Sequence, residues 1–134
     1  MGLFSIKVVD AHCDIPCGIY ETDTMTHAAN TCVRMIEKIE ALGEVDNNEK
    51  HNTFIRCIMV KEQHAERVKH ELAVLWGDYF KPEHLEKFPN LHETFWHALK
   101  QASKVKQSVS MEEAKKLQET VHEIGHIFVE SKQA

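Results

Sequence analysis

The sequence of 134 residues predicts an all-α protein, an up-and-down antiparallel four-helix bundle, and three observations support this fold class. Apolar residues recur at steps of three and four over most of the chain, which is the period of an amphipathic helix. Glycine and proline are scarce, with five and three residues, so a turn-rich β fold is disfavoured. The helical stretches are separated by short connectors, which is typical of antiparallel neighbours in a bundle.

The first helix is expected from Thr24 to about Leu42, where Gly43 provides a stop. The second begins near Glu49 and ends before Pro82, because a residue that precedes proline avoids the helical conformation. At roughly 30 residues, the second helix has an expected length of about 45 Å. The apolar stripes of these two helices are Met25, Ala28, Cys32, Met35, Ile36, Ile39 and Leu42, then Phe54, Ile58, Ala65, Val68, Leu72, Leu75, Trp76 and Tyr79.

A short connector with Pro82 and Pro89 precedes the third helix. The fourth is expected to begin at a capping box, in which the Ser110 hydroxyl and the Glu113 carboxylate bind free amides at the helix start. The apolar stripes here are Leu91, Phe95, Ala98, Ala102 and Val105, then Ala114, Leu117, Val121, Ile124 and Phe128.

Composition limits the class of protein. A hydrophobic fraction of 43% and a charged fraction of 28% are ordinary for one soluble domain. The net charge of −5 gives no reason to expect nucleic-acid binding, and no apolar run of about 18 residues predicts a membrane span. The segment Met1 to Ala11 is too short for a secretory signal, so a cytoplasmic protein is expected. Cys32 and Cys57 lie on apolar faces and are expected to be reduced core residues.

The densest chemistry lies in nine residues near the start of the chain. Two thiolates and an imidazole suit zinc, copper, nickel or iron rather than magnesium or calcium. Proline and glycine beside the second thiol favour a tight turn that brings both sulfur atoms to one point. A free amine at the histidine would add a further nitrogen donor and would point to nickel or copper. The stretch is His12, Cys13, Asp14, Ile15, Pro16, Cys17, Gly18, Ile19 and Tyr20.

This run, H-C-D-x-P-C-G-x-Y, closely resembles the nickel hook of the nickel-containing superoxide dismutases. A second block of that family resembles Val60 to Gln63, Leu75-Trp76, Asp78 to Pro82, and Glu86-Lys87 followed by an aromatic residue and Pro89. The resemblance spans most of residues 12 to 132. It implies an enzyme that converts superoxide to O2 and hydrogen peroxide by cycling between Ni(III) and Ni(II), and that assembles as a homohexamer.

The resemblance also implies a division of the chain and a set of ligands. Residues 1–11 would be a propeptide that a maturation protease removes between Ala11 and His12, followed by the hook at 12–20 and the bundle at 21–134. One nickel ion per subunit would be held by His12, Cys13 and Cys17. The amine of His12 would ligate throughout, and its imidazole in the oxidised state.

Two further residues receive roles from the resemblance. The hydroxyls of Tyr20 and Tyr79 would face the metal pocket and order water or substrate. Asp14 and Lys81 are weaker candidates from their own chemistry: Asp14 would fix the hook by accepting backbone amides, and Lys81 would attract the anion. The chain also departs from the family, because the positions of an outer glutamate and arginine that steer the axial histidine hold Ala28 and His64. Either His64 or His27 replaces that interaction, or the axial ligand is less well held.

Two other functions stay open from the sequence. The first is a bundle that carries nickel or copper without turnover. The second is a zinc hydrolase, because His122-Glu123-Ile124-Gly125-His126 matches H-E-x-x-H, which places two imidazoles on one helix face. Only eight residues follow His126, so a third ligand would have to come from His92 or His97 on a neighbouring helix.

Overall fold

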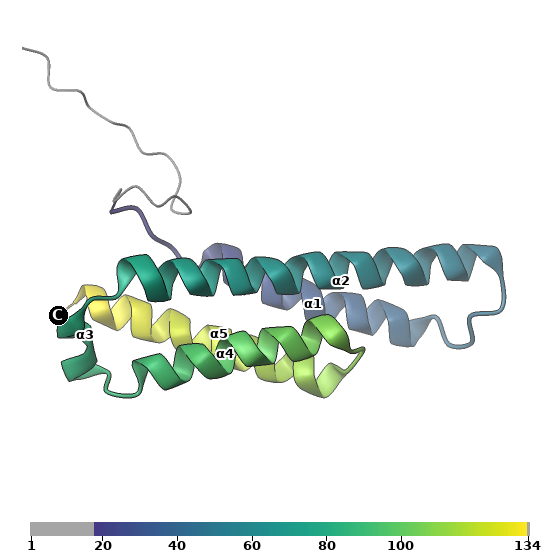
Figure 1. Ribbon diagram of the computed structural model, residues 1–134. Coiled ribbons are helices and arrows are strands. Elements are labelled where there is room, and N and C mark those ends of the chain that lie inside the picture. Colours follow the sequence, from purple (N-terminus) through teal and green to yellow (C-terminus); the bar gives the residue numbers. More distant parts are fainter. Residues whose placement is uncertain (1–17, 134) are drawn as a thin grey trace, which may run out of the picture.

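A computed structural model describes residues 18–133, and nearly all of this part of the chain is helical (Figure 1). Four long helices are joined by short segments, with a π-helical turn, η1, at the end of the second. In chain order the elements are α1 (Asp23–Ala41), α2 (Asn48–Val74), η1 (Leu75–Tyr79), α3 (Pro82–Lys87), α4 (Leu91–Gln107) and α5 (Met111–Lys132).

The four long helices form a closed bundle in which each helix packs against two others. α1 contacts α2 and α5, and α4 contacts the same two helices. Consecutive helices run in opposite directions, so the predicted up-and-down bundle is confirmed (Figure 1). Five alanines lie among its fully buried residues, which lets the helix backbones approach closely. These alanines are Ala28, Ala65, Ala98, Ala102 and Ala114.

The ends of the helices follow the expected chemistry in most places. Gly43 has a φ of 59°, a conformation that favours glycine, and it ends α1 as predicted. The Ser110 hydroxyl accepts from the Glu113 amide at 3.3 Å, which is one half of the expected capping box. The Glu113 carboxylate instead accepts from the Gln101 side chain of α4 at 2.6 Å, because an amide donor from the facing helix reaches it.

The predicted connector between the second and third long helices contains the short helix α3. Pro82 occupies its first turn, where the missing N–H is not needed and the fixed φ suits a helix. The His84 ring accepts from the Lys81 amide at 2.9 Å through Nδ1 and so satisfies a free donor at the start of α3. A histidine at this capping position is an uncommon signal, which explains why the sequence pattern did not predict the helix.

The core holds a charged residue, Lys61, that the pattern did not mark. Lys61 is only 1% exposed, and its Nζ donates to the carbonyls of Val105 and Lys106 at 2.5 and 2.8 Å. These are among the last carbonyls of α4, which have no partner within their own helix. Burial lowers the pKa of Lys61 below its ordinary value.

Cys32 and Cys57 are free and buried, as expected. None of the described helices is both long and apolar enough to cross a membrane.

Candidate functional site

The structure describes only the last part of the predicted hook. His12, Cys13, Asp14 and Cys17 lie outside the described residues. The described chain begins at Gly18, which has a φ of 70°, so a residue with a side chain would be strained at this point. The site is therefore built here from Gly18 onward.

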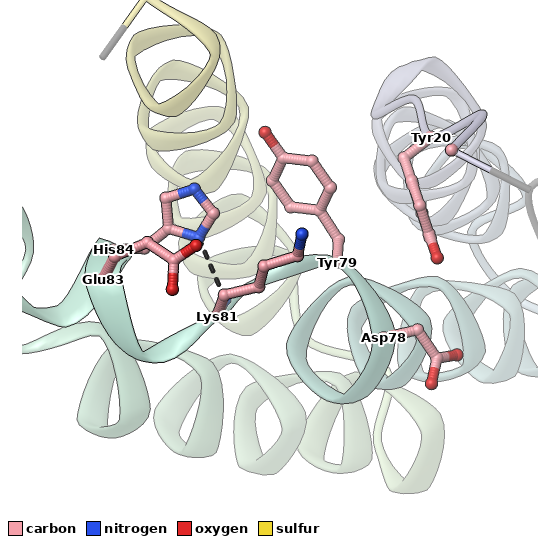
Figure 2. Close-up of a pocket in the computed structure, with 7 residues that line it drawn as sticks. Tyr20, Asp78, Tyr79, Lys81, Glu83 and His84 are labelled. Atoms are coloured by element: carbon pink, nitrogen blue, oxygen red, sulfur yellow. Dashed lines mark hydrogen bonds between the residues drawn. The ribbon is translucent and has the colours of Figure 1, made fainter. Parts of the chain in front are cut away.

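Gly18 is one of seven residues that line an open pocket of about 450 Å³. Figure 2 shows the side chains of this lining. The walls of the pocket come from the segment before α1, from the end of η1 and from the start of α3. Segments about 60 residues apart in the sequence thus meet at one end of the bundle. The lining residues are Gly18, Tyr20, Asp78, Tyr79, Lys81, Glu83 and His84.

Tyr20 and Tyr79, both predicted to belong to the site, lie side by side. Their ring centroids are 5.3 Å apart with the planes tilted by 55°. Figure 2 shows the two hydroxyl groups pointing in different directions. The Tyr79 hydroxyl bonds to Ser131 Oγ of α5 at 2.7 Å, and Ser131 in turn donates to the Phe128 carbonyl at 2.6 Å. Because that carbonyl can only accept, Tyr79 is the donor to Ser131.

The π-helical turn η1 determines the position of the Tyr79 side chain. The Phe80 amide donates to the Leu75 carbonyl, five residues earlier, at 3.0 Å, so the last turn of this long helix is one residue wider than an α-helical turn. The Tyr79 ring then packs against Phe80 at 4.9 Å and Phe128 at 4.8 Å, and it stacks on His84 at 5.7 Å. Aromatic contacts on several sides hold the ring in one orientation.

Ser131 belongs to this arrangement, and the sequence pattern did not mark it. It is 5% exposed and lies three residues after Phe128 on the buried stripe of α5. The only sequence signal is a small polar residue that continues an apolar stripe, and this signal is weak.

The charges around the pocket nearly cancel. Lys81 provides one positive charge, whereas Asp78 and Glu83 provide two negative charges, so the formal sum is −1 without His84. The Nδ1 atom of His84 accepts from the Lys81 amide, so the neutral ring carries its proton on Nε2. The lining by itself therefore has no net positive charge with which to attract an anion.

Ala28 and His64 occupy the two positions where the chain departs from the family. Along the bundle axis they lie far from the pocket beside Tyr79. The Cys32 thiol donates to the Lys61 carbonyl at 3.5 Å, and in an antiparallel pair this contact places residues 28 and 65 at the same level. Ala28 is fully buried, whereas His64 is half-buried and donates through Nδ1 to the Val60 carbonyl at 2.8 Å. His27 is exposed. Along the second long helix, fifteen residues, or about 22 Å, separate His64 from Tyr79.

The two histidines of H-E-x-x-H share one face of α5, as expected from their spacing. Their ring centroids are 4.5 Å apart, and both side chains are exposed. Within residues 18–133 no three histidine, cysteine or acidic side chains lie close enough to hold a metal ion together. In this part of the chain, the ligand set of a zinc hydrolase is therefore incomplete.

Comparisons with known proteins give a consistent result. The family model described as nickel-containing superoxide dismutase matches residues 7–132. The chain is 41% identical to a nickel superoxide dismutase of Streptomyces seoulensis and 39% identical to one of Streptomyces coelicolor, and each match covers 98% of this chain and 97% of the relative. A native nickel superoxide dismutase structure matches with a TM-score of 0.82 and 37% identity, over 92% of this chain and 100% of the solved chain.

Proposed function

Because the chain belongs to the nickel-containing superoxide dismutase family, we propose that residues 12–20 form a hook that holds one nickel ion per subunit. The protein is a nickel-dependent oxidoreductase that converts superoxide to O2 and hydrogen peroxide. The proposed ligands are His12, Cys13 and Cys17. Bound nickel supplies a one-electron couple between Ni(III) and Ni(II) that superoxide can both reduce and oxidise.

The donor set fits this metal. Thiolates and nitrogen donors are the ligands that late first-row metals prefer, and several of them within six residues can surround one ion. Thiolate is the ligating form of cysteine, so loading the hook releases protons.

The observation that carries the proposal is the pocket that starts at Gly18. Because Cys17 is bonded to Gly18, their Cα atoms must lie about 3.8 Å apart, whatever path the preceding residues take. Of the proposed ligands, Cys17 is therefore tethered directly to a pocket that contains Tyr20 and Tyr79. We assign these two tyrosines to ordering water or substrate beside the metal, and Asp14 to fixing the hook.

The supply of protons follows from the same lining. Each hydrogen peroxide formed from superoxide takes up two protons. The Tyr20 hydroxyl, the Lys81 ammonium and the Nε2–H of His84 are donors on this lining. The Tyr79 hydroxyl donates to Ser131, so it can give a proton to the substrate only when that bond opens, but its oxygen can still accept from a water molecule.

We further propose that residues 1–11 are a propeptide and that cleavage between Ala11 and His12 frees the amine ligand. A peptide nitrogen inside a chain cannot act as a neutral amine donor. The native solved relative is matched over its whole length by 92% of this chain, and the remaining 8% of 134 residues is about eleven residues, the length of this leader. A homohexamer is proposed from the family resemblance, and a cytoplasmic location is proposed as expected from the sequence.

The decisive experiment compares one chain prepared in two forms, starting at Met1 and starting at His12. Nickel content and superoxide dismutation are measured for both, with Cys13→Ser in the His12 form as a control. We expect about one tightly bound nickel ion per subunit, retained after dialysis, and activity only in the His12 form with Cys13 present. Equal nickel content and equal activity in the two forms would refute the amine ligand.

One departure favours a second candidate, a nickel or copper carrier without turnover. The family's outer glutamate and arginine are replaced by Ala28 and His64, so the axial ligand lacks its usual support. In the same experiment, stoichiometric metal in the His12 form without any dismutation would support the carrier.

A further inference from the structure

We propose that His122 and His126 on the outer face of α5 form a second transition-metal site, independent of the hook. The site would take a divalent late first-row ion such as Ni²⁺, Zn²⁺ or Cu²⁺, with water in the remaining positions. Imidazole is a preferred ligand of these ions, and two imidazoles on a rigid helix can chelate one ion.

The geometry of α5 carries the first step. Residues four apart lie one above the other on a helix, and here the two ring centroids are only 4.5 Å apart. Both side chains are exposed, so small rotations about their side-chain torsions can turn two ring nitrogens toward one ion. The backbone already brings the two ligands together, so little conformational entropy is lost on binding.

The availability of the ring nitrogens carries the second step. Most other histidines of the described chain already use a ring nitrogen: His51, His64, His84 and His92 in hydrogen bonds, and His97 beside Glu93. Within residues 18–133, neither His122 nor His126 has such a bond, and their recorded contact is with each other. A metal ion therefore displaces no hydrogen bond to another group of residues 18–133.

The surroundings carry the third step. At 100° per residue, Glu119, His122 and His126 lie within a sector of about 60° around the helix axis. A carboxylate is therefore on the same face of α5 as the two imidazoles. Glu119 and His122 also line one open pocket of about 320 Å³ between α1 and α5, together with Thr26, Asn30 and Gln118. Glu119 lies outside coordination distance in this conformation, so it contributes negative charge to the site rather than a third ligand.

This arrangement differs from a hydrolytic zinc site. Two protein ligands leave the ion loosely held and exchangeable, whereas a catalytic zinc ion is held by three. A binding site without hydrolysis is the consequence. In the nickel-loaded enzyme, the site adds a second and weaker class of bound metal.

The test is calorimetric titration of untagged full-length chain with Ni²⁺ and, separately, Zn²⁺. The background carries Cys13→Ser and Cys17→Ser, so that the thiolates of the hook do not contribute. We expect one site per chain, weakened at least about tenfold by His122→Ala or by His126→Ala. The matched control is His97→Ala on α4, an exposed histidine without a histidine four residues away, and it should bind like the background.

A second readout locates the ion. Ni²⁺ is paramagnetic, so substoichiometric nickel should broaden the imidazole NMR signals of His122 and His126 before those of the other histidines. Alanine favours helix more than histidine, so the variants should keep the fold, and circular dichroism checks this. If His122→Ala titrates like His97→Ala, or if other imidazoles broaden first, the proposal is wrong. A hook that fails to bind nickel would leave this result unchanged.

Discussion

Replacement of the buried lysine, Lys61→Met, should destabilise the bundle, because it removes the hydrogen bonds that join α2 to the end of α4. Methionine keeps most of the apolar stem in place, so the change removes mainly the ammonium group. The carbonyls of Val105 and Lys106 then lose their donor at the end of α4. Each orphaned carbonyl costs about 1–3 kcal/mol, and relief from burying the ammonium offsets part of this cost. The expected net loss in the free energy of unfolding is about 2–4 kcal/mol.

The assay is urea unfolding followed by circular dichroism. The slope with urea should stay constant, and the midpoint should fall. Lys106→Met is the matched control, because its backbone carbonyl still accepts from Lys61 and only the exposed Lys106–Glu66 ion pair at 2.6 Å is lost. Exposed pairs of this kind contribute little. Equal midpoints for Lys61→Met and Lys106→Met would show that the hydrogen bonds of the Lys61 ammonium to α4 do not stabilise the bundle.

The pH dependence gives an independent check with a definite sign. Burial holds the pKa of Lys61 below the ordinary value of 10.5 in the folded chain. The unfolded chain therefore binds more protons in the window just below pH 10.5, and the free energy of unfolding rises with pH there. Lys61→Met lacks this titration, so the stability gap between wild type and variant should widen as the pH rises through that window.

Three further predictions concern the site and the thiols. Tyr79→Phe removes the hydrogen bond to Ser131 and should lower the free energy of unfolding in urea by about 0.5–1.5 kcal/mol, with the nickel content unchanged. If Tyr79→Phe costs the same in a Ser131→Ala background, the hydrogen bond between Tyr79 and Ser131 does not contribute to stability. His64→Arg restores the guanidinium of the family and should raise dismutation per bound nickel, whereas a variant no more active than wild type would show that His64 already suffices. Burial raises the pKa of Cys32 to about 11, so a thiol reagent at pH 8 should modify Cys32 only after unfolding, as peptide mass mapping would reveal.

The fold was predictable because helical periodicity reports burial directly. The stripes through Phe95 and Ile124 are buried as their spacing indicated, and so is the stripe through Met25 except for the half-buried Met35 and Leu42. Gly43 ends α1 where expected. The burial of Lys61 was not predicted, because a charged residue within an apolar stripe indicates an exposed position. Its role depends on the carbonyl groups of a helix 44 residues away, which no local pattern encodes.

The candidate site was predictable only where it is local in sequence. The hook is a run of nine residues whose donor types indicate the class of metal. The pairing of Tyr20 with Tyr79 came from the resemblance, whereas Ser131 needed the bundle, because its contact with Tyr79 joins residues 52 apart. The π-helical turn that orients Tyr79 has no signal in the pattern, since Leu75 and Tyr79 also fit an α-helix.

The two levels of the bundle constrain how the outer residues can act on the hook. His64 lies about 22 Å along the long helix from Tyr79, whose pocket begins at Gly18. Six residues separate His12 from Gly18, and even fully extended they span only about 20 Å. A segment whose ligands converge on one ion spans much less, and that span is shorter than the separation of His64 from Tyr79 along the helix. If His64 steers the axial histidine, we infer that it does so on the hook of a second copy. The need for this contact would then be a physical reason for the proposed homohexamer.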